Sequence, residues 1–138
     1  MSELSEDQIR QHLKESHRIA VVGLSRKPDR PSHRVAAYLQ RVGYEIVPVH
    51  PVPGVTLGQQ VHPNLRSAAA AGPLDIVDIF RRSEYIPALL DDLLAVRPRL
   101  VWLQLGIDHP ETVRRLEEAG IDVVVNRCLA VDHQWLRA

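Results

Sequence analysis

The segment IAVVGLSRKPDRPSHRVAAYL (Ile19–Leu39) joins an apolar run, a short polar loop and the beginning of an amphipathic helix. The uninterrupted apolar run, 18–23, is typical of a strand that is buried on both faces of a parallel sheet. Gly23 ends this strand, Ser32 is the expected N-cap of the helix, and Gly43 follows the last helical residue. The pattern therefore predicts a strand–loop–helix unit of the kind that binds nucleotides.

Similar apolar runs recur along the chain, separated by segments with helical periodicity or with turn residues. The four further strands are predicted at 44–49, 74–80, 99–106 and 121–126. Strands that alternate with helices in this way predict an α/β fold, a Rossmann-like doubly wound sheet of about five parallel strands with helices on both faces. Right-handed crossovers favour the strand order 3-2-1-4-5, counted along the chain.

Three segments lie outside this alternation. A leading helix is predicted at about 5–16, from its apolar stripe and a plausible N-cap. The segment 50–65 is rich in proline and glycine, and it predicts either an ordered loop or a small hairpin. For the tail, 130–138, the sequence leaves two alternatives open: packing on the sheet, or a contact in a homodimer.

The bulk composition indicates one soluble globular domain over residues 1–138, with 45% hydrophobic and 25% charged residues. Seventeen basic residues balance 17 acidic ones, which argues against nucleic acid or a membrane surface as a partner. The polar N-terminus does not resemble a signal peptide, and a single cysteine fits a reducing cytoplasm. We therefore expect a cytoplasmic protein, and its preference for arginine over lysine is typical of a thermophilic or GC-rich source.

The loop after the first strand is the candidate ligand site, because ligands of doubly wound sheets bind beyond the carboxyl ends of the strands. Gly23 permits a tight turn and a close approach of the backbone to a ligand, and the N-terminus of the next helix favours a phosphate. Ser25 can donate its hydroxyl. Four basic side chains add local positive charge: Arg26, Lys27, Arg30 and Arg34. We therefore expect a phosphate-bearing ligand at this loop.

The glycine pattern argues against NAD as that ligand. A dinucleotide fingerprint has the form G-x-G-x-x-G, whereas Gly23 is the only glycine between the strand and the helix. An NAD site also requires an acidic residue at the end of the second strand, where this chain has Val49 and His50. NADP stays open, because basic residues can accept its additional phosphate.

Four motifs, in order along the chain, resemble those of the stand-alone CoA-binding domain proteins. They are VGLSRKPDRPSHRVAAYLQRVGYEIVPVHP, LDIVDIFRRSEYIP, VWLQLGI and VNRC, and they extend from about Arg18 to Cys128. These proteins are similar to the CoA-binding N-terminal domain of the succinyl-CoA synthetase alpha subunit. The resemblance implies a Rossmann-like fold that holds coenzyme A (CoA) across the ends of its strands.

The resemblance also implies which residues contact CoA. The phosphate loop of the family is matched by Gly23, Leu24 and Ser25. An R-x-S element that contacts phosphate or caps the helix is matched by Arg30 and Ser32. The adenine and ribose side is matched by Val49, His50 and Pro51, although the family often has Asn in place of His50. The cleft is closed by Phe80 and Arg81, and its other half is formed by Gln104, Gly106, Asn126 and Cys128.

The resemblance implies a ligand but no reaction, so we expect a CoA- or acyl-CoA-binding protein that is not catalytic on its own. Two alternatives stay open. One is an NADP-linked or acyl-CoA enzyme that uses Cys128, and the other is a regulatory adaptor whose CoA occupancy alters a protein partner. The seven histidines do not have the spacing of metal ligands, so we expect no metal site.

Overall fold

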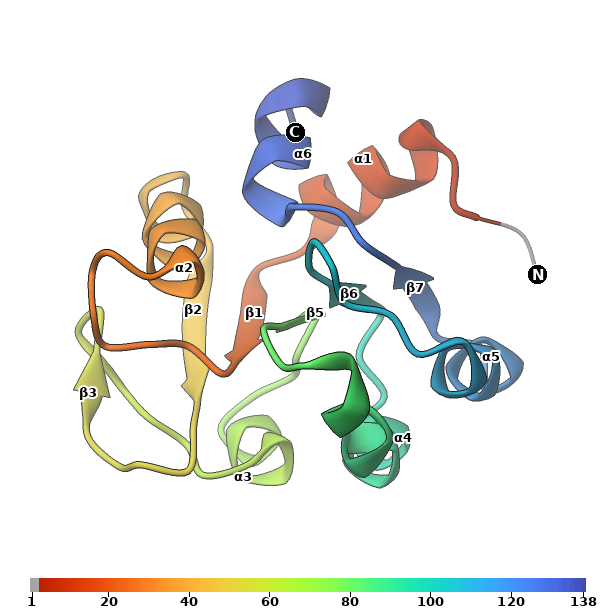
Figure 1. The fold of residues 1–138 in the computed structure, drawn as a ribbon. Helices are drawn as coiled ribbons and strands as arrows, with labels where there is room; N and C mark the ends of the chain where they lie inside the picture. The colour runs from red at the N-terminus through yellow and green to blue at the C-terminus, as the bar shows by residue number, and fades with distance from the viewer. Residues whose placement is uncertain (1–2) are drawn as a thin grey trace.

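The computed structural model describes residues 3–138, and five apolar segments form its central parallel sheet (Figure 1). The strands are β1 (Arg18–Val22), β2 (Glu45–Val49), β5 (Ile76–Ile79), β6 (Leu100–Leu103) and β7 (Asp122–Val124). All residues of β5 and β6 are buried, which explains why these segments are continuous apolar runs with a single exception. The predicted α/β Rossmann-like fold of five parallel strands is confirmed.

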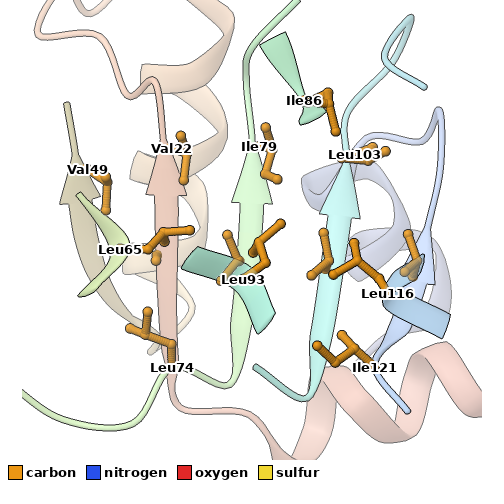
Figure 2. Close-up of a cluster of buried hydrophobic side chains, with 14 of the residues drawn as sticks. Val22, Val49, Leu65, Leu74, Ile79, Ile86, Leu93, Leu103, Leu116 and Ile121 are labelled. Carbon is orange, nitrogen blue, oxygen red and sulfur yellow. The ribbon is translucent and has the colours of Figure 1, made fainter. Parts of the chain in front are cut away.

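Helices cover both faces of the sheet, as predicted (Figure 1). On one face lie α1 (Glu6–Glu15), α2 (Pro31–Arg41) and α6 (Leu129–Leu136). On the other lie α3 (Leu65–Ala70), α4 (Leu90–Val96) and α5 (Pro110–Glu118). Each layer buries its own apolar cluster against the sheet. Figure 2 shows the cluster on the face covered by α3, α4 and α5, where Leu65, Leu93 and Leu116 pack over the strands.

The strand order is β2-β1-β5-β6-β7, so the predicted order was wrong in the position of one strand. The predicted third strand, β5, does not lie outside β2; it pairs with β1 on the opposite side, with Ile19 beside Ile76. The physical reason is Pro48 in β2, which has no N–H to donate to a further strand and therefore favours an edge position. On that outer side, the part of the chain that the structure describes gives β2 only an isolated bridge between Val49 and His62.

This order places the switch point of the sheet between β1 and β5. The connections leave these two neighbouring strands toward opposite faces, so the loops at their carboxyl ends diverge and leave a crevice. The segment after β2 forms the small hairpin that was one of the two predicted possibilities, with strands β3 (Val55–Thr56) and β4 (Gln59–Gln60). Two 3₁₀ turns follow β5, at Ser83–Tyr85 and Pro87–Leu89.

Both terminal helices pack on the same face of the sheet (Figure 1). Leu129 and Leu136 of α6 are buried, and the Tyr38 hydroxyl lies 2.7 Å from Nδ1 of His133. Of the two alternatives for the tail, the structure shows packing within the chain, although Trp135 stays 75% exposed. Among residues 3–138, no helix has the length and apolar character that a membrane span requires.

Candidate functional site

An open cleft of about 590 Å³ lies at the carboxyl ends of β1, β5 and β6, at the switch point. The loop after β1 and the start of α2 form its first wall, which consists of Gly23, Ser25, Lys27, Arg30, Pro31 and Ser32. The loops after β5 and β6 form the rest, which consists of Phe80, Arg81, Arg82, Gly106 and Ile107. The cleft therefore brings together eight of the 16 residues that the sequence predicts for the site, and it adds Pro31, Arg82 and Ile107.

Gly23 sets the path of the first wall. Its φ of +84° lies in the left-handed region, and its N–H donates to the carbonyl of Val49 at 2.9 Å. A Cβ atom at this position would lie 2.4 Å from the backbone oxygen of Phe80. Only glycine allows the loops after β1 and β5 to approach this closely.

The loop between Gly23 and α2 is fixed by hydrogen bonds between its own residues. The N–H of Ser25 donates to Oγ of Ser32 at 3.0 Å, and Oγ of Ser25 accepts from the N–H of Lys27 at 3.1 Å. Ser32 is therefore not the N-cap that the sequence predicts: Pro31 occupies the first turn and Arg30 is the N-cap residue. Proline fits the first helical position, where its missing N–H has no intrahelical partner to lose.

The N-terminus of α2 is open to a ligand. No side chain caps its first turn, so the backbone N–H groups of Ser32 and His33 have no partner within the helix. Pro31 and Ser32 line the cleft, which places this helix end at its wall. Free N–H groups and the positive end of the helix dipole together favour an anion.

Positive charge gathers in the cleft without compensation by carboxylates. Within residues 3–138, Lys27, Arg30 and Arg81 take part in no ion pair, and Arg82 approaches Glu84 only at 3.9 Å. The Nε atom of Arg81 is buried and has no hydrogen-bond partner. A buried donor without an acceptor is uncommon in folded proteins, so this N–H is available to an acceptor atom of a ligand or of a water molecule.

The positive charges of the cleft and its neighbouring loops also affect His50, at the end of β2. Burial, followed by the charges of Arg81 and Arg26, lowers the pKa of His50, so that its imidazole is neutral at physiological pH. Nδ1 of His50 accepts from the N–H of Val52 at 3.0 Å, which fixes the ring beside the loop. Neither His50 nor the exposed Pro51 lines the cleft.

Arg26 has a different role from the one that the sequence predicts. Its guanidinium donates to the carbonyls of Val52 and Pro53 and lies against Gly54, outside the lining of the cleft. Arg26 thus joins the loop after β1 to the loop after β2. The side chains of Leu24 and Val49 are buried in the core, so these two residues can offer a ligand only their backbone.

Three further predicted residues do not line the cleft either. Gln104 is buried, and its Nε2 donates to Oδ1 of Asp78 at 2.6 Å. Asn126 accepts a hydrogen bond from the N–H of Gly106 at 2.6 Å, and Cys128 packs against the apolar cluster beneath α6. The direction of Gln104 could not be inferred because the predicted order did not place β5, which carries Asp78, beside β6. The neighbour of β7 was predicted correctly, so the error in strand order does not account for the directions of Asn126 and Cys128.

Asp78 is the functional candidate that the sequence analysis missed. It lies in the middle of β5 with no exposed surface, and burial raises its pKa to about 8 although the hydrogen bond from Gln104 opposes this shift. Its Oδ2 atom is buried without a partner. The signal was visible in LDIVDIF, where a second acidic residue interrupts a strand that is otherwise apolar.

A second cavity, of about 520 Å³, lies between β7, α5 and the segment before α1. Besides Arg127, whose guanidinium pairs with Asp132, its lining includes the carboxylates of Glu3, Asp108 and Glu117. These side chains repel phosphate groups, so this cavity does not compete with the cationic cleft as an anion site.

Comparison with known proteins agrees with the fold. Residues 17–134 match the family described as CoA binding domain. The uncharacterized protein YneT of Bacillus subtilis (strain 168) is 40% identical over 133 residues, which cover 96% of this chain and 97% of YneT. A solved structure from Thermus thermophilus is also 40% identical, with a TM-score of 0.92 over 96% of this chain and 99% of that chain.

A more distant likeness extends to a domain of a larger enzyme. The dinucleotide-forming acetyl-coenzyme A synthetase 1 of Ca. Korarchaeum cryptofilum, solved with phosphate and ADP, is 20% identical with a TM-score of 0.68. The match covers 78% of this chain and 25% of that chain, and at this identity it shows the shared fold alone. The family match over nearly the whole chain confirms the predicted resemblance, and the chain belongs to the CoA-binding domain family.

Proposed function

We propose that this protein binds CoA or an acyl-CoA in the cleft at the switch point and does not transform it. The observation that carries the proposal is the unpaired cationic lining: Lys27, Arg30 and Arg81 face the cleft without carboxylate partners. Membership of the CoA-binding domain family supports CoA as the anion that this charge pattern would bind.

The chemistry of CoA matches this lining better than that of a simple dinucleotide. CoA carries a 3′-phosphate on its ribose in addition to its pyrophosphate, and so needs positive charge at more than one place. The turn at Gly23, Ser25 and the open end of α2 offer N–H and O–H donors for one phosphate group. Arg81 and Arg82, across the cleft, offer guanidinium groups for another.

The cleft supports binding more than catalysis. Within the described chain its lining contains no carboxylate, histidine or cysteine, so Ser25 and Lys27 have no general base beside them in the lining. Cys128, on which the enzymatic alternative depends, packs against the core cluster and not at the cleft.

Thermal unfolding with a panel of ligands tests the proposal. CoA and acetyl-CoA at 100 times their dissociation constants should stabilise the native state by about 2.7 kcal/mol, whereas NAD and ATP at equal concentration should stabilise it less. Arg81→Gln should weaken the effect of CoA, and Arg115→Gln, on the exposed face of α5, is the matched control. Stabilisation by NADP without stabilisation by CoA would overturn the proposed function.

A further inference from the structure

The segment 104–107 forms the neutral wall of the cleft, through Gly106 and Ile107. It follows β6, and its conformation is not fixed by regular secondary structure. The N–H of Ile107 donates to the carbonyl of Gln104 at 3.0 Å, which closes a single turn. Two side chains from the neighbouring strands hold this turn from either side.

The first of these contacts is buried. Gln104 and Asp78 lie on the same face of the sheet, and the amide of Gln104 donates to Oδ1 of Asp78 at 2.6 Å. The two flanking positions on neighbouring strands are Val21 and Trp102, which offer no charge to the carboxyl group. An apolar side chain at 78 would avoid the desolvation of an acid, so the carboxyl group is explained by the contact that it makes with Gln104.

The second contact comes from the strand on the other side. Asn126 follows β7 with φ +59°, a left-handed conformation that asparagine tolerates better than most residues. Its Oδ1 accepts from the N–H of Gly106 at 2.6 Å. The left-handed backbone at 126 and the hydrogen bond to Gly106 thus belong to one arrangement.

We infer that Asp78 and Asn126 are positioning residues for the cleft: through Gln104 and Gly106 they fix segment 104–107 at the distance that bound CoA requires. This inference rests on the proposed function. Neither side chain lines the cleft itself, so each acts on the ligand only through the segment that it holds. The family resemblance implies that Gln104 and Asn126 contact the ligand directly. In this inference both act indirectly, by holding segment 104–107 in place.

Paired variants test the inference, with CoA affinity measured by calorimetry and hydrogen exchange measured at the amide of Gly106. Asn126→Gly keeps the left-handed backbone but removes the acceptor, so exchange at Gly106 should become faster. CoA affinity should fall about three- to tenfold, the effect of losing one hydrogen bond. Asn126→Asp keeps the acceptor and should restore both properties. Asp78→Ala and Asp78→Asn form the corresponding pair for the buried contact.

The outcomes separate this inference from the proposed function. Faster exchange at Gly106 with unchanged CoA affinity would show that the position of the wall does not matter, and would overturn the inference alone. Unchanged exchange in Asn126→Gly would overturn it as well, because the contact would not hold the segment. A wild-type protein that binds no CoA would instead refute the proposed function, and the inference with it.

Discussion

At Gly23 one residue determines how closely two loops of the cleft can approach. Its backbone is left-handed, and the carbonyl of Phe80 occupies the space that a side chain would need. Gly106 is also left-handed, with φ +80°, but among residues 3–138 no atom beyond its two chain neighbours lies within 4 Å of the position of its missing Cβ. The two glycines therefore separate the effect of backbone conformation from the effect of steric contact.

Gly23→Ala is predicted to lower the free energy of unfolding by about 2–4 kcal/mol, since a left-handed alanine is strained and its Cβ also collides with backbone. Gly106→Ala should lower it by only about 1–2 kcal/mol, because it carries the conformational cost alone. Urea denaturation of both variants measures the difference. Equal losses in the two variants would show that the contact with Phe80 has no influence.

Asp78 makes stability depend on pH in the unusual direction for an acid. Its pKa is raised to about 8 in the folded protein, whereas an unfolded aspartate titrates near 3.9. Its contribution to stability is therefore complete below about pH 4 and is lost as the pH rises toward 8, because the unfolded chain releases this proton first. Asp78→Asn removes the titration and keeps an acceptor for Gln104.

The stability of Asp78→Asn should therefore increase relative to wild type as the pH rises. Between pH 5 and pH 8 we expect the difference in unfolding free energy to change by about 3–4 kcal/mol in favour of the variant. Urea titrations at several pH values provide the measurement, and other ionisable groups cancel in the comparison. A difference that stays constant over this range would contradict the raised pKa.

At the scale of elements, the strands could be predicted because burial on both faces leaves a continuous apolar run. Their order could not be predicted from crossover handedness alone, since a strand can be added on either side of β1. Pro48 carried the missing information: a residue without an N–H identifies β2 as an edge strand. An edge position for β2 excludes the predicted order 3-2-1-4-5, in which β2 would lie between two strands, and agrees with the observed order.

The parts of the candidate site that are formed by backbone could be predicted from the sequence. The directions in which its side chains point could be predicted less well. The turn at Gly23 and the helix end that follows it are properties of local sequence, and both lie at the cleft. The directions of Gln104 and Asn126 depend on which strands flank β6, and those contacts are set only by the complete fold.

The start of α2 yields a prediction at the same scale. Ser32→Ala leaves the N–H of Ser25 without its acceptor, so it should lower stability by about 1 kcal/mol and also weaken CoA binding by loosening the loop. Ser67→Ala, in α3, removes a hydroxyl that contacts Nδ1 of His62 at 3.0 Å and should affect stability alone. Calorimetric titration of both variants separates the two effects. Wild-type CoA affinity in Ser32→Ala would argue against a role for this loop.

At the scale of the whole molecule, the charges balance, with 17 basic and 17 acidic residues, yet the cleft is cationic. Acidic side chains lie elsewhere, in ion pairs on the helices and around the second cavity. This separation directs an anionic ligand to one place without making the protein a general binder of polyanions. The sheet order contributes as well, because it opens the crevice beside the same strand that carries Gly23.

The most direct test is the crystal structure of the protein grown with saturating CoA. We predict that one phosphate group lies within hydrogen-bond distance of the backbone between Gly23 and Ser25, and that the guanidinium of Arg81 contacts a phosphate oxygen. CoA bound in the acidic cavity beside β7, or a cationic cleft that contains only solvent at saturation, would contradict this prediction.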